Sequence, residues 1–174
     1  MPKSYIFAGY TVASGLPHIT ESQAKRLTHL NVAFGVVKDK RISVEAIEGF
    51  FRFIPRLRAC NPDLKILLST GGGNQIGHGE ATADPESLAA FVDSTMEVVR
   101  KYGFDGIDCD WEFPGYYGNK EEKYQHTALL RAYRAALDAY GEECGKKCFL
   151  TIAAAAGQWF LDDVEIEKIH PLLD

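Results

Sequence analysis

Three acidic side chains alternate with apolar ones in the middle of the chain, at Asp108, Asp110 and Glu112. Side chains alternate along a β-strand, so these acids would share one face and rise ~13 Å along it at ~3.3 Å per residue. Cys109 and Trp111 would share the opposite face, packed under helices. Burying several acids is costly unless hydrogen bonds, shared protons or a substrate offset the cost, so such a row often marks a functional site.

The sequence around this row predicts repeated βα units. Five short β-like runs recur, and each leads into a helix-like stretch or a loop before one. Three of the runs are nearly all apolar, which is typical of parallel strands buried on both faces. The predicted strands are Tyr5–Tyr10, His29–Val37, Leu64–Thr70, Phe104–Trp111 and Phe149–Ala155. Repeating βα units can close as a barrel or lie open as a doubly wound sheet, and periodicity leaves both open.

An edge strand with its acids in water would give the same alternation around Asp108, but the flanking βα units favour a central strand. Three helix starts are predicted by residues that cap a first turn. They are the pairs Thr20 and Gln23, Asn119 and Glu122, and Asp84 and Pro85. Gly103 is expected to end the helix that starts at Pro85. The apolar stretch after Ser43 has helical spacing, but Pro55 must kink or divide it.

Composition narrows the classes of partner. The formal net charge is -5 and the 19 Lys and Arg residues form no run, which argues against nucleic acid and leaves a neutral ligand such as a sugar as the better fit. No stretch approaches the ~20 apolar residues of a membrane span, so no membrane partner is expected. No signal peptide is visible at residues 1–4, although a removed signal would look the same. The compartment stays open.

The cysteines and histidines predict no metal site. Cys60, Cys109, Cys144 and Cys148 contain no C-x-x-C pair, and no histidine stands at metal-ligand spacing, so buried or idle thiols are expected. A disulfide between Cys144 and Cys148 stays open for an exported protein. The five histidines show no paired spacing, which favours core or solvated roles for all of them.

The pattern D-x-x-D-x-D-x-E, formed by Asp105, Asp108, Asp110 and Glu112, resembles the signature of glycoside hydrolase family 18, the chitinases and endo-β-N-acetylglucosaminidases. Supporting pieces stand in order on the other predicted strands. They are Gly9-Tyr10, Asn31-Val-Ala-Phe34, Ser69-Thr-Gly-Gly72 and Leu150-Thr-Ile-Ala-Ala154. Cys109 and Phe113 are mild departures from the family pattern. The resemblance spans nearly the whole chain.

This resemblance implies an α/β fold, the (β/α)8 TIM barrel, of which residues 1–174 would be a single partial catalytic domain with about the first five strands. A full barrel takes ~250 residues. The family's Met-x-Tyr-Asp motif of the sixth strand and its Trp of the eighth strand are not found in this sequence. The chain alone is therefore expected to be inactive, and to need the remaining barrel half or self-association to cover its open edges.

The family implies hydrolysis of β-1,4-linked N-acetylglucosamine polymers by a retaining mechanism in which the substrate's N-acetyl oxygen is the nucleophile. Glu112 would protonate the leaving oxygen and then activate water. Asp110 would hold the acetamido group, and Asp108 would share a proton with Asp110. Asp105, out of phase with the row, is expected to be a structural support. No cofactor and no metal are implied, and chitin or an N-acetylglucosamine oligosaccharide is the expected partner.

Tyr10, Phe34, Gly71 and Gly72 are the candidate substrate-binding residues, with a plain core role equally open for Phe34. Three aromatic residues could stack on sugar rings or pack on neighbouring loops. They are Trp159, Tyr116 and Tyr117.

Two other functions compete with the hydrolase. One is a lectin-like module of the same fold without turnover, which the presence of Glu112 disfavours because chitinase-like lectins typically replace that acid. The other is a nucleotide-binding α/β protein whose glycines from Gly71 to Gly73 cradle phosphate. The next helix signal comes only at Asp84, which disfavours this second reading. Secretion is typical of the resembling family.

Overall fold

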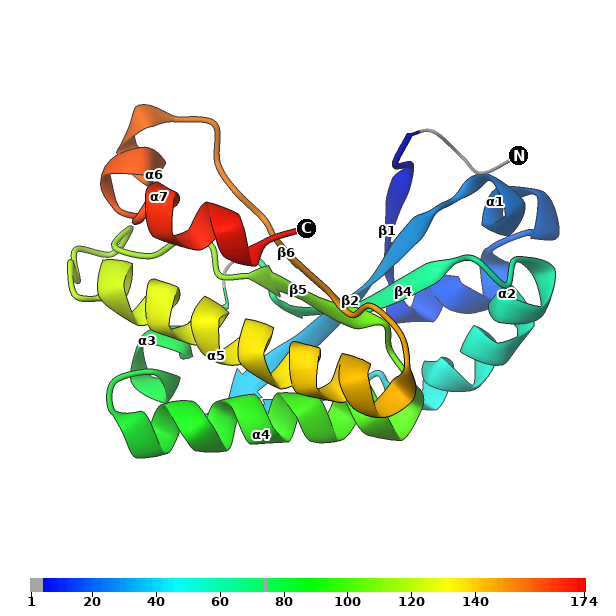
Figure 1. The fold of residues 1–174 in the computed structure, drawn as a ribbon, viewed down its shortest axis with the longest axis horizontal. Helices are drawn as coiled ribbons and strands as arrows, with labels where there is room; N and C mark the ends of the chain where they lie inside the picture. The colour runs from blue at the N-terminus through cyan, green and yellow to red at the C-terminus, as the bar shows by residue number, and fades with distance from the viewer. Residues whose placement is uncertain (1–4, 74) are drawn as a thin grey trace.

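The computed structural model describes residues 5–73 and 75–174, and the expectation about a signal peptide at residues 1–4 lies outside them. Within the described residues, a six-stranded sheet forms the centre of the molecule (Figure 1). Its parallel strands, paired in this order, are β1 (Ala8–Val12), β2 (His29–Lys38), β4 (Lys65–Gly71), β5 (Gly106–Asp110) and β6 (Phe149–Ile152). Strand order follows chain order, as repeated right-handed βα units require. All five predicted strands are confirmed, with ends that differ by a few residues.

One of the six strands of the sheet was not predicted from the sequence. Strand β3 (Arg41–Ser43) pairs antiparallel with the end of β2. The connecting residues Asp39 and Lys40 both have positive φ, 50° and 60°, which is the conformation of a two-residue hairpin turn. Such turns usually contain glycine or asparagine, so Asp-Lys gives little signal in the sequence.

Helices cover the outer face of the sheet. The two longest, α4 (Pro85–Tyr102) and α5 (Glu122–Cys144), lie side by side beneath β5 and β6 (Figure 1). Shorter helices lie in the connections between strands and after β6. They are η1 (Ala13–His18), α1 (Glu21–Arg26), η2 (Glu48–Phe53), α2 (Ile54–Cys60), α3 (His78–Ala81), α6 (Gln158–Asp162), α7 (Ile166–Ile169) and η3 (His170–Leu172). No helix of the described residues has both the length and the apolar character to span a membrane.

Two of the three predicted helix starts are confirmed. Thr20 and Gln23 form the reciprocal capping box of α1, and the Asp84 side chain accepts a 2.8 Å bond from the Ser87 N–H at the start of α4. Gly103 ends α4 at φ 67°, a left-handed conformation that favours glycine. Pro55 divides its segment as expected, because η2 ends at Phe53 and α2 begins at Ile54.

The predicted capping box of Asn119 and Glu122 is wrong. Helix α5 begins at Glu122 without a side-chain cap, and the Asn119 side chain accepts a bond from the Glu121 N–H instead. The Glu122 carboxylate turns away to accept a 2.9 Å hydrogen bond from the Gly115 N–H. The need to pin the loop after β5 therefore overrides the local capping pattern.

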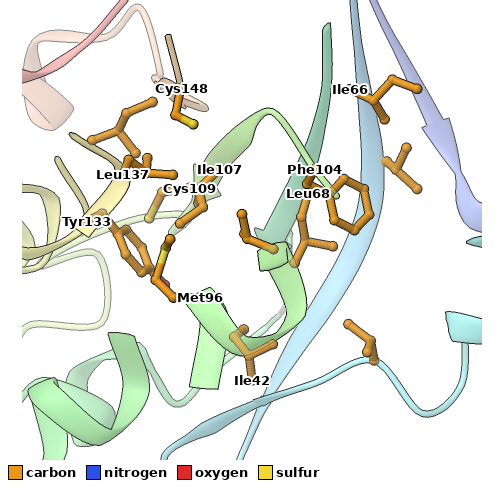
Figure 2. Packing of buried hydrophobic residues seen from close by; sticks show 14 of the residues in the cluster. Ile42, Ile66, Leu68, Met96, Phe104, Ile107, Cys109, Tyr133, Leu137 and Cys148 are labelled. Carbon is orange, nitrogen blue, oxygen red and sulfur yellow. The ribbon is translucent and has the colours of Figure 1, made fainter. Parts of the chain in front are cut away.

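The core lies between the outer face of the sheet and the two long helices, as Figure 2 shows. The strands contribute Leu68, Ile107 and Cys109, and the helices contribute Met96 and Tyr133. All of these side chains are buried. The outer face of β5 is thus fixed by apolar packing, which in turn fixes the direction of its inner face.

Candidate active site

The acid row lies on the inner face of β5 and continues past the end of the strand. The side chains of Asp108 and Asp110 are 1% and 2% exposed, and Glu112 is half-buried just beyond the strand. Cys109 and Trp111 are buried in the core cluster on the opposite face. The alternation predicted from the sequence is confirmed, and the acids point away from the helices.

Three hydroxyl groups from three other strands hold Asp108. The Tyr10 hydroxyl of β1 donates a short hydrogen bond to Asp108 Oδ2, and Ser69 Oγ of β4 donates to the same oxygen at 2.8 Å. Thr151 Oγ1 of β6 donates to Asp108 Oδ1. Burial, followed by the bond to Asp108, raises the pKa of Tyr10 well above its usual value, so the phenol stays a donor. Strands from both ends of the sheet therefore converge on one carboxylate.

Asp110 is a buried acid with one oxygen that lacks a partner in the described residues. Its Oδ1 atom is buried and has no hydrogen-bond partner within residues 5–73 and 75–174. Burial, then the nearby charge of Asp108, a hydrogen bond with Asp108 and the charge of Glu112 raise the pKa of Asp110 to about 8. Asp110, coupled to Asp108, therefore tends to keep a proton at neutral pH, and the two carboxyl groups release their protons as a pair.

The turn after β4 brings backbone against this site. Gly71 and Gly72 both have φ 94°, and the Gly72 N–H donates a 2.8 Å bond to the Asp110 carbonyl oxygen. A Cβ at Gly71 would lie 2.5 Å from that same oxygen, and one at Gly72 would lie 2.8 Å from the Phe34 ring. Only glycine fits at these two positions, both because of φ and because of the contacts.

The same turn is poorly suited to phosphate. A Cβ at Gly73 would lie 3.9 Å from Glu112 Oε2, so the turn faces the acid row. The next helix, α3, has four residues and follows Gly77 rather than the glycine turn itself. A phosphate there would meet carboxylates instead of the N-terminus of a long helix, which argues against the nucleotide-binding alternative.

The predicted substrate-binding residues form one side of the site. Tyr10 is 56% exposed on β1 although its hydroxyl reaches the buried Asp108. Phe34 is half-buried on β2 and packs against Gly72. The structure thus brings Tyr10, Phe34 and the two glycines close to the acid row.

Exposed aromatic side chains stand on the other side, after β5 and β6. Trp159 contacts Phe113 and Tyr116, with ring centroids 5.3 Å and 5.5 Å apart, and Tyr116 contacts Tyr117 at 5.2 Å. Trp159, Tyr116 and Tyr117 are nonetheless exposed. These residues therefore pack on neighbouring loops and still present ring surface to solvent.

Asp105 is a structural support, as its phase in the strand predicted. It accepts a 2.9 Å bond from the Ile66 N–H and pairs with Arg58 at 2.8 Å and Lys146 at 3.0 Å. Burial acts to raise the pKa of Asp105, but the bond from Ile66 and the two cations lower it below its usual value overall. The ionised carboxylate ties β4, α2 and the loop after α5 together.

Sequence reasoning did not single out Ser69 and Thr151 as site residues. Both stand opposite Asp108 in the sheet, because Asp108 is in register with Ser69 of β4 and with Thr151 of β6. The sequence does show a serine or threonine in each of the two strands that flank β5. These residues can be matched to Asp108 only when the strand register is known.

The remaining cysteines and histidines fall into core and surface positions. All four cysteines are free thiols in the structure, with Cys144 exposed and Cys148 buried. His78 and His126 are buried beside Trp111, whereas His18 and His170 are exposed. In the described part of the chain, no group of three or more potential metal ligands comes together.

Comparison with known proteins decides the family. The family model described as glycosyl hydrolases family 18 matches residues 6–174. The chain belongs to glycosyl hydrolases family 18. It is 37% identical over 139 residues to chitinase A1 of Niallia circulans, which covers 75% of this chain and 20% of that protein. It is 31% identical over 160 residues to a class V chitinase of Arabidopsis thaliana, covering 88% of this chain and 41% of the relative.

Solved structures agree with this assignment. A family 18 N-acetylglucosaminidase from Paenibacillus barengoltzii superposes with a TM-score of 0.94 at 39% identity, over 98% of this chain and 52% of that one. A class V chitinase from Nicotiana tobaccum, solved as a mutant in complex with NAG4, has a TM-score of 0.79 at 26% identity, over 96% and 49%. A chitinase-like agglutinin from Robinia pseudoacacia has a TM-score of 0.81 at 26% identity, over 96% and 52%. The fold is the predicted (β/α)8 type, covered in part, and the chain spans about half or less of these proteins.

Proposed function

We propose that the complete protein carrying this chain hydrolyses β-1,4-linked N-acetylglucosamine polymers of the chitin type by substrate-assisted retaining catalysis. The observation that carries the proposal is the buried acid pair beside Glu112, in which the pKa of Asp110 is raised and one Asp110 oxygen has no partner among the described residues. An acetamido group offers the N–H donor that this oxygen lacks. The chitinases among the relatives, and the complex of one of them with NAG4, support the same substrate class.

In this mechanism the acetamido carbonyl oxygen attacks the anomeric carbon while the bond to the leaving glycosidic oxygen breaks. Glu112, half-buried at the mouth of the site, donates its proton to that leaving oxygen. The product is an oxazolinium ion and a shortened saccharide. Glu112 then accepts a proton from water as the water oxygen opens the oxazolinium ion, and the acid is regenerated.

Asp110 and Asp108 act as a pair. The acetamido N–H donates to Asp110 Oδ1, and the proton of the pair passes towards Asp108 as positive charge develops on the oxazolinium ion. The ionised Asp110 then stabilises that charge at short range in a site shielded from water. The three hydroxyls on Asp108 keep the pair in one geometry throughout.

A chitooligosaccharide-binding module without turnover is the second candidate, because an agglutinin shares this fold. Glu112 favours the enzyme. Binding alone requires shape and hydrogen bonds, whereas a half-buried acid two residues after a protonated buried carboxyl adds little to recognition of a neutral sugar. The two functions differ in a single measurable property, the cleavage of the bound saccharide.

The test is cleavage of chitotetraose by the complete natural polypeptide that contains this sequence. We expect turnover by the wild type, a loss of about 10³-fold in Glu112→Gln, and retained chitotetraose affinity by calorimetry, because the substitution removes a proton and little shape. Glu121→Gln, an exposed substitution at the start of α5, is the matched control and should leave turnover unchanged.

Two results would count against the proposal. Wild-type protein that binds chitotetraose without cleaving it would be the lectin-like module. If Glu112→Gln turned over chitotetraose within about tenfold of the wild-type rate, Glu112 would not be the catalytic acid.

A further inference from the structure

Behind the acid row, on the outer face, Trp111 lies between two buried histidines. The His78 ring of α3 stacks on the indole, with centroids 5.2 Å apart and planes 15° apart. The His126 ring of α5 meets the indole edge-on at 5.8 Å and 88°. Trp111 is 6% exposed and His78 only 1%. The residue directly before Glu112 is therefore held from two sides.

His78 also contacts the glycine turn that ends β4. A Cβ at Gly71 would lie 2.6 Å from His78 Cε1 and 2.5 Å from the Asp110 carbonyl oxygen. One imidazole ring thus fills the space between the end of β4 and the indole that follows β5. A thinner or wider side chain at position 78 would change how the indole of Trp111 packs against the end of β4.

An ordinary core residue would not be a histidine here. Neither ring nitrogen of His78 has a hydrogen-bond partner in residues 5–73 and 75–174, and the ring packs edge-on against Phe91 at 5.8 Å. Burial, followed by the nearby His126, lowers the pKa of His78 to about 3, so the ring is neutral at ordinary pH. Buried polar atoms without partners reduce stability, and phenylalanine would avoid that loss. Packing alone therefore does not account for the imidazole.

The position of Glu112 depends on its neighbours in the chain. Phe113, the residue after Glu112, packs against Trp159 and Phe160. The backbone of Glu112 is thus fixed by the side chains on either side of it, and the Trp111 side is set by His78.

We propose that His78 is a positioning residue whose five-membered ring sets the separation between Trp111 and Gly71, and so places Glu112 relative to Asp110. This inference rests on the proposed function, because it assigns His78 a part in the same reaction. A six-membered ring at position 78 would press on Gly71 and the indole, and a methyl group would let the indole move inward. Either change would displace the Glu112 carboxyl group from the leaving oxygen, and a displacement of ~1 Å can slow a reaction about 10²-fold.

The experiment compares His78→Phe and His78→Ala with wild type in the complete protein, using chitotetraose kinetics and thermal unfolding. His18→Phe, at an exposed position in η1, is the control. For His78→Phe we expect kcat, measured well below the unfolding midpoint of the variant, to fall by about tenfold or more while KM changes by less than about threefold. His78→Ala should lower both kcat and Tm, and His18→Phe should change neither.

A plain packing role predicts the opposite for phenylalanine, because a stable apolar ring would then preserve activity along with Tm. His78→Phe with wild-type kcat would therefore overturn the positioning role while leaving the hydrolase intact. Wild-type protein that cleaves no chitotetraose would instead overturn the proposed function, and the positioning role with it.

Discussion

The two faces of β5 are equally buried, yet their burial has opposite effects on stability. On the outer face Ile107 and Cys109 lie among apolar side chains of the sheet and the long helices, where burial favours folding. On the inner face Asp108 and Asp110 lie at the same depth as a like-charged pair, where burial opposes ionisation and raises the pKa of Asp110 to about 8. One strand of five residues thus carries both the packing that holds the fold and the groups proposed to carry the chemistry.

Burial alone therefore does not indicate what a residue contributes to the protein. The outer side chains are apolar and need only packing contacts. On the inner face, three hydroxyls donate hydrogen bonds to Asp108, whereas one oxygen of Asp110 has no hydrogen-bond partner in the described chain. A protein selected for stability alone would have little reason to keep such a pair. Substitutions on the two faces should therefore separate activity from stability.

The largest effect is expected on the inner face. Asp110→Asn should lower turnover of chitotetraose by about 10²–10³-fold, because the amide cannot stabilise the charged oxazolinium ion. Stability should be unchanged or slightly higher, since a buried carboxyl is replaced by a neutral group of the same shape. Kinetics and urea unfolding on the same preparation check both parts. Equal hydrolysis of an N-acetyl-free glucan by the wild type would contradict substrate assistance.

The outer face should show the reverse. Ile107→Ala removes a fully buried side chain and should lower the free energy of unfolding by about 2–5 kcal/mol. The kcat of the folded fraction should stay within about threefold of wild type when it is measured well below the unfolding midpoint. Ile76→Ala, at an exposed position, is the control and should change stability by less than about 0.5 kcal/mol. A loss of kcat as large as that of Asp110→Asn would erase the proposed division between the faces.

The raised pKa of Asp110 should make the stability of the protein depend on pH. Because the pKa of Asp110 is raised to about 8, the folded protein binds more protons than the unfolded chain between the usual carboxyl pKa of ~4 and pH 8. Its contribution to stability is therefore fully present in acid and is lost as pH rises to about 8. Urea unfolding from pH 5 to 9 should show this loss in wild type and not in Asp110→Asn. Parallel curves for the two proteins would mean that Asp110 ionises normally.

His126, buried behind β5, should make the free energy of unfolding fall in acid instead. Burial lowers the pKa of His126 to about 4, below the ~6.5 of an exposed histidine. The unfolded chain then binds more protons between these values, so stability is lost as pH falls from about 6.5 towards 4. His126→Phe should flatten this acid limb in urea unfolding while leaving the region above pH 7 unchanged. An unaltered acid limb would show that His126 becomes protonated without unfolding.

Much of this arrangement could be predicted from the sequence, because the signals are local. Alternation along β5 was enough to place Asp108 and Trp111 on opposite faces, and Asp84 with Gly103 was enough to bound α4. The wrong prediction at Asn119 has a physical reason, because the Glu122 carboxylate accepts a hydrogen bond from the Gly115 N–H, seven residues earlier. Local capping rules do not include such competition for a side chain.

Other features depend on contacts between distant elements. The hydroxyls of Ser69 and Thr151 meet Asp108 only because of the strand register, and register cannot be read from one strand at a time. His78 and His126 reach Trp111 from two different helices, with 47 residues between the two histidines in the chain, so no short sequence spacing predicts their contact. The β2–β3 hairpin has a turn without glycine, which removes the usual signal.

The stereochemistry of cleavage tests most directly whether the reaction proceeds by two displacements at the anomeric carbon, as the proposed mechanism requires. Proton NMR of the complete protein acting on chitotetraose reports the anomeric form of the newly formed reducing end before mutarotation. The mechanism predicts that the β-anomer appears first and the α-anomer grows in later, because two displacements at the anomeric carbon restore its configuration. The α-anomer appearing first would mean a single displacement by water and would contradict the roles given to Asp110 and Glu112.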